Sequence, residues 1–127
     1  MKKFAVITGG SKGIGKALVE KFATEGFTVI TCARNSSDLE VLQRKYKSVL
    51  FTVCDLSVRE DQQKFVNYVK EQTDRLEVLI NNTGMYVPGQ VYNEEEGVLE
   101  KMINTNLYSA YHVTRGVMPV FLEQKAG

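Results

Sequence analysis

A glycine-rich turn near the N-terminus is the segment of this chain best suited to chemistry, because Gly9, Gly13 and Gly15 stand there between two regular elements. The β-branched apolar run 4–8 stops at this turn, and an amphipathic segment follows it at once. Glycines let a backbone turn tightly and approach a phosphate closely, and a helix that begins there points free N–H groups at the same anion. The pattern predicts a strand, a phosphate-binding loop and a helix, with a purely structural tight turn as the alternative.

The spacing of this loop is Thr-Gly-x-x-x-Gly-x-Gly rather than the strict Gly-x-Gly-x-x-Gly of the dinucleotide fingerprint. A dinucleotide would lie along the whole stretch, since both the turn and the first turn of the helix face it. The residues that we expect to contact it here are Thr8, Gly9, Ser11, Lys12, Gly13, Ile14 and Gly15.

The charge just beyond the second predicted strand indicates which dinucleotide would fit. A free ribose 2′-hydroxyl is bound best by a carboxylate at this place, whereas a 2′-phosphate is repelled by a carboxylate and favours a guanidinium. Arg34 occupies the place, the first acid after it is Asp38, and Lys12 adds a positive charge from the glycine loop. The two cations favour NADP(H) over NAD(H), and the alternative is that both are solvated surface charges.

Polar residues also follow the third and fourth predicted strands. Asp55 and Leu56 come after the third, and Asn82, Thr83 and Gly84 come after the fourth. The aspartate could accept a hydrogen bond from an adenine amino group, or it could cap the next helix. Asparagine amides can tie strand ends together and a glycine lets the chain pass close to a ribose, with an ordinary polar loop as the alternative. Ligands of parallel α/β sheets bind at the carboxyl ends of the strands, so we expect these residues to share one cleft.

Strands and helices alternate along the chain, which is typical of an α/β fold. Apolar runs predict strands at 4–8, 27–32, 48–54 and 76–81, and amphipathic segments predict helices at 14–24, 36–46, 57–73 and 94–124. We expect Ser36 or Ser37 and then Ser57 as N-caps, and Pro119 as a kink or an end of the last helix. The strands are almost continuously apolar, which indicates burial on both faces. Right-handed crossovers then predict a three-layer Rossmann fold with a parallel sheet in the order 3-2-1-4.

Length and composition are those of an ordinary globular domain, with 127 residues of which 43% are hydrophobic and 24% charged. A net charge of +1 without a basic cluster argues against nucleic acid as a partner, and no apolar run is long enough to span a membrane. The N-terminus lacks a signal-peptide pattern, so we expect a cytoplasmic protein. Cys32 and Cys54 form no disulfide framework, one histidine is too few for most metal sites, and we expect reduced thiols and no metal.

These motifs, in their order and spacing, resemble the N-terminal half of the short-chain dehydrogenase/reductase family along essentially the whole chain. Residues 8–15 are similar to the cofactor loop of that family, and residues 55–56 to its adenine-side pair. Residues 81–84 resemble its Asn-Asn-Ala-Gly motif, with Thr83 in place of the alanine. Residues 104–107 resemble the helix-four segment whose second asparagine, here Asn106, belongs to the catalytic set.

The resemblance implies an oxidoreductase that moves a hydride between a nicotinamide cofactor and a small carbonyl or alcohol substrate, with Asn106 helping to hold a water in a proton relay. The serine of the family and its Tyr-x-x-x-Lys pair would lie on a fifth strand and helix, which residues 1–127 do not contain. We therefore expect a Rossmann domain truncated before these elements and inactive by itself. Tyr111 is followed four residues later by Arg115, which cannot be tuned as a lysine can, so we expect Tyr111 to pack rather than act as the acid.

Family members of this kind assemble through their long fourth helix, so the resemblance also implies a homodimer or homotetramer. Without a fifth strand, the apolar strand at 76–81 becomes an edge, and one face of the last helix, with Met102, Tyr108 and Tyr111, loses its cover. The alternative function is a non-catalytic module that binds a nucleotide or promotes oligomerisation.

Overall fold

Four parallel strands form the centre of the molecule in the computed structural model, which describes all of residues 1–127. They are β1 (Phe4–Thr8), β2 (Thr28–Ala33), β3 (Val49–Val53) and β4 (Val78–Ile80). The strands lie in the order β3-β2-β1-β4, so the predicted order is confirmed. All pairs are parallel, and the loops after the strands therefore leave the same edge of the sheet.

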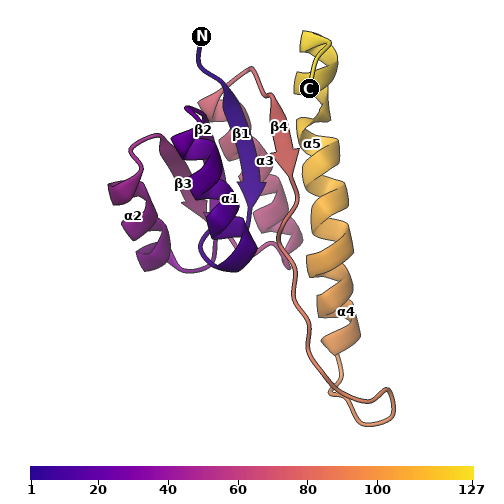
Figure 1. The fold of residues 1–127 in the computed structure, drawn as a ribbon. Helices are drawn as coiled ribbons and strands as arrows, with labels where there is room; N and C mark the ends of the chain where they lie inside the picture. The colour runs from indigo at the N-terminus through magenta and orange to yellow at the C-terminus, as the bar shows by residue number, and fades with distance from the viewer.

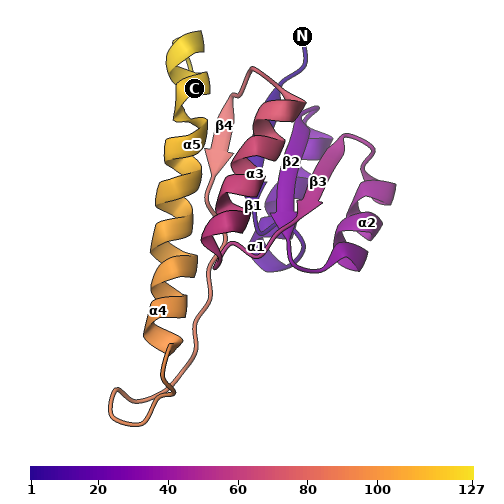
Figure 2. The same cartoon turned by 180° about the vertical axis from the view of Figure 1, so that it is seen from behind.

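Helices cover both faces of the sheet and give the three predicted layers (Figure 1 and Figure 2). One face carries α1 (Gly13–Thr24) and α2 (Ser36–Lys45), and the other carries α3 (Arg59–Gln72) and a long C-terminal helix. The long helix consists of α4 (Val98–Ile103), a π-helical turn η1 (Asn104–Tyr108) and α5 (Ser109–Gln124), and it begins at Val98 rather than at residue 94. None of the helices combines the length and the apolar character that a bilayer span requires.

Each face of the sheet has its own hydrophobic core, because side chains alternate between the two faces along a strand. Val6 of β1 packs with Phe65 of α3 and Val113 of α5, whereas its neighbour Ile7 packs on the opposite face with Val19 of α1. Helices α2 and α3 each bury an apolar face against these cores, and the buried residues include Leu39, Leu42, Phe65, Val66 and Val69.

Two predicted N-caps are wrong. The cap of α2 is Asn35, whose Oδ1 accepts a hydrogen bond from the Asp38 N–H at 3.2 Å, rather than either of the two serines that follow. Helix α3 begins after Val58, which has no capping side chain, rather than at Ser57. Ser57 instead donates its N–H and its hydroxyl to Asp55 in the preceding turn. Asparagine caps a helix as well as serine does, so local preference alone does not decide between them.

Pro119 lies inside α5, which continues to Gln124, so of the two predicted outcomes, a kink or an end, the end is wrong. A proline removes one backbone hydrogen bond, but Val117 beside it is fully buried against α3 and holds the helix in place. Gly116 permits this close packing, because a Cβ atom there would lie 2.6 Å from both methyl carbons of Val66.

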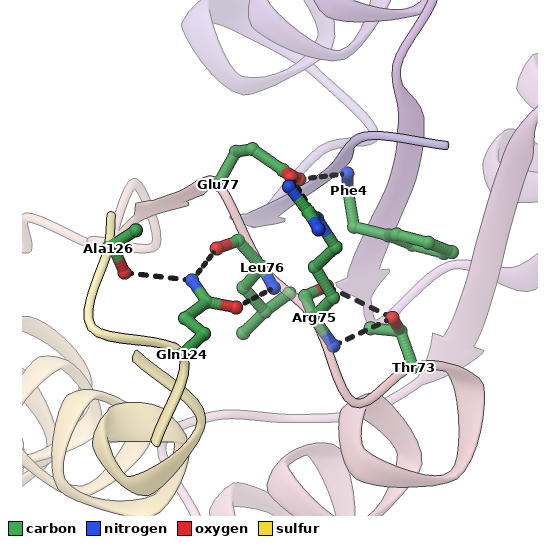
Figure 3. A network of polar contacts seen from close by, with 7 residues as sticks. All are labelled: Phe4, Thr73, Arg75, Leu76, Glu77, Gln124 and Ala126. Atoms are coloured by element: carbon green, nitrogen blue, oxygen red, sulfur yellow. Dashed lines mark hydrogen bonds and ion pairs between the residues drawn. The ribbon is translucent and has the colours of Figure 1, made fainter. Parts of the chain in front are cut away.

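Strand β4 is shorter than the predicted strand 76–81, and hydrogen bonds to distant residues hold the segment just before it. The side-chain amide of Gln124 clamps Leu76: its Oε1 accepts from the Leu76 N–H at 3.1 Å, and its Nε2 donates to the Leu76 carbonyl oxygen (Figure 3). Glu77 accepts from the Phe4 N–H at 2.6 Å and from Arg75 Nε at 2.8 Å (Figure 3). This network ties the end of the last helix to the amino ends of β1 and β4.

The outer edge of β4 has no neighbouring strand. β4 pairs only with β1, and its residues are half-buried. The long helix beside it presents an apolar stripe, defined as Leu107, Tyr111, Met118 and Leu122, whose members are 60%, 53%, 43% and 66% exposed. Their spacing places them along one side of the helix. Tyr108, at 48%, and Tyr111 are both exposed, which confirms that this face of the last helix lacks cover, whereas the expectation that Tyr111 packs within the chain is wrong.

Candidate functional site

A cleft of about 290 Å³ lies at the carboxyl ends of the strands, where the loops after all four strands meet. This is the edge at which parallel α/β sheets bind ligands. The residues singled out from the sequence that line it are Gly9, Ser11, Lys12, Arg34, Asp55, Leu56, Asn82, Thr83 and Gly84. The remaining five, which do not line it, are Thr8, Gly13, Ile14, Gly15 and Asn106.

The glycine loop brings the start of α1 against the end of β1. A Cβ atom on Gly15 would lie 2.1 Å from the Gly9 carbonyl oxygen and 2.3 Å from Asn82 Nδ2, so only glycine fits there. Helix α1 begins after Lys12 with no capping side chain, and its first N–H groups therefore lack a side-chain acceptor. The side chain of Ile14 is 75% exposed and points away from the cleft. This arrangement suits an anion bound by backbone N–H groups.

Thr8 acts behind the loop rather than at its surface. It is buried, and its hydroxyl oxygen accepts hydrogen bonds from the N–H groups of Asn82 and Thr83, both at 3.0 Å. Asn82 in turn donates from Nδ2 to the Gly9 carbonyl oxygen at 3.1 Å. These bonds fasten the loop after β4 to the loop after β1, which fixes the floor of the cleft.

A more open hollow, which we call the cationic hollow, adjoins the cleft and is lined by Ser11, Lys12, Arg34, Asn35 and Ser36. It has two cations and no carboxylate among its lining residues. The two hydroxyl groups and the amide can donate further hydrogen bonds. Charge and donors together suit a phosphate monoester, which takes up charge-assisted bonds from guanidinium and ammonium groups.

Asp55 lines the cleft, and its predicted role as the cap of the next helix is wrong. Its Oδ1 accepts from Ser57 N–H at 3.0 Å and from Ser57 Oγ at 2.7 Å, which makes a turn before the helix. Burial raises the pKa of the Asp55 carboxyl, but the Ser57 hydrogen bonds and the charges of Arg34 and Lys101 lower it by more, so its pKa lies below the ordinary value. Asp55 is therefore charged at neutral pH, and it makes no protein hydrogen bond through Oδ2.

Asn106 uses its whole side chain to hold the loop after β4. Its Oδ1 accepts from the Met85 N–H at 2.7 Å, and its Nδ2 donates to the Met85 carbonyl oxygen at 2.8 Å. The residue sits in the π-helical turn η1, in which Ser109 N–H bonds to the Asn104 carbonyl oxygen. Such turns are frequent at functional sites, because they reorient the residues they contain.

Other residues that line the cleft were not among those predicted to bind a cofactor. Met85 follows the glycine after β4, and Lys101 and Thr105 reach the cleft from the long helix. The hydroxyl oxygen of Thr105 is buried without a hydrogen-bond partner. In the sequence, the only signal for Thr105 is its place between Asn104 and Asn106.

Both cysteines also line the cleft, and both are free and buried, as predicted. Burial raises the pKa of the Cys32 thiol and of the Cys54 thiol. Both thiols therefore stay protonated at neutral pH, and neither is a nucleophile.

The model of the short chain dehydrogenase family matches residues 3–127. The chain belongs to the short-chain dehydrogenase family. A tropinone reductase homologue of Arabidopsis thaliana is 36% identical over 132 residues, which represent 98% of this chain and 49% of that relative. The chain thus spans about half the length of the relatives it matches.

Solved structures of short-chain dehydrogenases show the same fold. A metagenomic short-chain oxidoreductase in complex with NADP superposes with a TM-score of 0.91 at 28% identity, over 98% of this chain and 59% of that one. An actinorhodin polyketide ketoreductase with NADPH gives a TM-score of 0.90 at 25% identity, over 99% of this chain and 51% of that one. The predicted family resemblance and the Rossmann fold are both confirmed.

This short-chain dehydrogenase chain offers no substitute acid at its cleft. Tyr111 lies outside the cleft, and its hydroxyl oxygen accepts from Arg115 Nη1 at 3.0 Å. His112 packs against the rings of Tyr108 and Tyr111, also away from the cleft. Burial lowers the pKa of His112, and so do the charges of Arg59 and Arg115.

Proposed function

We propose that residues 1–127 form the nucleotide-binding domain of an NADP(H)-dependent oxidoreductase that acts on a small carbonyl or alcohol substrate. The observation that carries the proposal is the cationic hollow, where Lys12 and Arg34 meet beside the glycine loop and no carboxylate lines the wall. The NADP-bound and NADPH-bound relatives support the choice of cofactor.

The chain divides the binding of the cofactor among its loops. The uncapped N-terminus of α1 holds the pyrophosphate through N–H groups of Gly13, Ile14 and Gly15. Lys12 and Arg34 bind the 2′-phosphate, for which their charge is suited. The free Oδ2 of Asp55 would accept a hydrogen bond from the adenine amino group, and Leu56, Thr83 and Gly84 would pack along the adenosine and the ribose.

The β4 side of the cleft lies where the reaction would take place. When it is bound, the nicotinamide of the cofactor supplies or accepts the hydride. Asn106 orders the loop at Met85 through two hydrogen bonds. Membership of the family implies that it would also help to hold a water in the proton relay. The apolar stripe supports assembly of the whole protein into a homodimer or homotetramer, because exposed apolar patches mark association sites.

The substitution Arg34→Asp tests the cofactor assignment. A charge-assisted bond to phosphate contributes about 1.5–3 kcal/mol, so the variant should bind NADPH roughly tenfold or more weakly and should then prefer NADH. Arg44→Asp is the matched control, because Arg44 is an exposed arginine on α2 outside the hollow and should leave both affinities unchanged. Equal affinities of the unmodified chain for NADPH and NADH, measured by fluorescence titration, would contradict the proposal.

A non-catalytic nucleotide-binding or oligomerising module is the second candidate, and the exposed apolar stripe is the observation that favours it. The whole protein separates the two candidates. Cofactor-dependent turnover of carbonyls or alcohols supports the oxidoreductase, whereas tight cofactor binding without turnover supports the module.

A further inference from the structure

The ammonium group of Lys12 faces two different partners. It lines the cationic hollow, and it also lies 3.9 Å from Oδ2 of Asp38 in the first turn of α2. That distance is an ion pair but too long for a hydrogen bond. Oδ2 itself is shielded from solvent and has no hydrogen-bond donor at all. The carboxylate oxygen thus has a single compensating group, the cation that would also bind a phosphate in the hollow.

Asp38 is held in this position by the chain around it. Its N–H donates to Asn35 Oδ1 at 3.2 Å, the bond that caps α2, so the backbone of Asp38 is fixed in the first turn of that helix. Asp38 lines neither the cleft nor the cationic hollow. It is therefore not placed as the acid of an NAD-type site would be, and it acts on the hollow through its charge and through Lys12.

We propose that Asp38 is a specificity-determining residue that moderates the preference for a 2′-phosphate by competing for Lys12. This inference rests on the proposed function of the cationic hollow. Lys12 is 79% exposed, and an exposed ion pair orders a side chain weakly, so Asp38 contributes little by positioning Lys12. Its negative charge, in contrast, opposes a phosphate dianion in the neighbouring hollow and offsets part of the attraction of Lys12.

The substitution Asp38→Asn tests this role, because it keeps the shape of the side chain and removes the charge. We expect NADPH and 2′,5′-ADP to bind about two- to fivefold more tightly at low salt, and NADH to bind unchanged. The gain should shrink at high salt, and it should also shrink when Lys12 is replaced by glutamine. Asp38→Glu should behave as the unmodified chain does.

Glu40→Gln is the matched control, since it removes one negative charge from an exposed residue of the same helix without an ion pair to Lys12. Thermal unfolding of each variant confirms that it is folded before titration. An unchanged or weakened affinity of Asp38→Asn for NADPH overturns the inference, and so does an equal gain from Glu40→Gln. If the unmodified chain binds neither NADPH nor 2′,5′-ADP, both the proposed function and this inference are wrong. If the unmodified chain binds them and only Asp38→Asn departs from the expected gain, the inference alone is wrong.

Discussion

The two flanks of the sheet differ in how completely their polar groups are hydrogen-bonded and their apolar side chains are covered. On the β1–β2 flank, Asn82 stabilises the glycine loop by donating from its N–H to the Thr8 hydroxyl oxygen and from Nδ2 to the Gly9 carbonyl oxygen. The two cations of the hollow lie just before α1 and in the loop after β2. On the β4 flank, the outer edge of the strand has no neighbour and the apolar stripe of the long helix is exposed. Within residues 1–127 the polar side has its hydrogen-bond partners, whereas the apolar side leaves large side chains exposed.

This difference predicts that cofactor binding depends on one flank and catalytic turnover on the other. Recognition of a dinucleotide needs local backbone geometry and a few charges, and residues 1–127 contain both. On the side that carries Asn106, residues 1–127 leave the apolar stripe exposed. We therefore expect changes on the two flanks to have different consequences, and the following experiments test that separation.

The largest expected effect concerns turnover. The chain of residues 1–127 should bind NADPH but should not oxidise it with a panel of carbonyl compounds, because none of its tyrosines has a lysine four residues later. General acid–base catalysis alone typically contributes 10²–10⁴-fold to a rate. Absorbance at the wavelength of NADPH measures this directly, and turnover that disappears in Tyr111→Phe would show that the β4 flank is catalytically complete.

Two glycine substitutions should separate the flanks by stability and by binding. Gly15→Ala forces a Cβ atom against the Gly9 carbonyl oxygen, and Gly116→Ala forces one against Val66. Each should lower the free energy of unfolding by about 1–3 kcal/mol in chemical denaturation. Only Gly15→Ala should also weaken NADPH binding by tenfold or more, so equal binding losses in the two variants would break the comparison.

The apolar stripe should drive self-association of residues 1–127. Burying an exposed leucine or tyrosine contributes about 1–2 kcal/mol, so Tyr111→Glu combined with Leu122→Glu should shift the chain towards the monomer in light scattering. Val41→Glu is the matched control, because Val41 is 57% exposed on α2, away from the stripe. A chain that is monomeric before any substitution would contradict the expected association.

The smallest expected effect is the pH dependence of the Glu77 network. Burial raises the pKa of Glu77, but hydrogen bonds from Arg75 and from the Phe4 N–H lower it by more, so the folded-state pKa lies below the ordinary value. A carboxyl group whose pKa is lower in the folded than in the unfolded state stabilises the fold at pH values above its unfolded-state pKa. That contribution is lost as the pH falls through its folded-state pKa. Glu77→Gln should therefore cost roughly 0.5 kcal/mol at pH 7 and progressively less as the pH falls through the folded-state pKa.

Chemical denaturation at several pH values measures this difference, and Glu123→Gln, an exposed residue of α5, is the control. A difference between Glu77→Gln and the unmodified chain that does not vary with pH would show that packing rather than charge is lost.

Local pattern was sufficient for the architecture. The alternation of apolar runs and amphipathic segments determined the strands, the helices and the order β3-β2-β1-β4, because handed crossovers leave few other ways to bury every face. The same alternation determined which loops share the cleft. The motif residues at 9–12, 34, 55–56 and 82–84 could therefore be assigned to one edge of the sheet from the sequence alone. The glycine spacing also required the close approach that the structure shows at Gly15.

Tertiary structure alone decided how distant residues use their polar groups. Gln124 bonds to Leu76, 48 positions away, while Asn106 bonds to the backbone of Met85, 21 positions away. The same holds for Asp38 beside Lys12, and for Lys101 and Thr105 at the cleft. A sequence pattern reports which side of an element is apolar, but the partner of a polar side chain depends on which elements come together, and that is determined only when the chain packs.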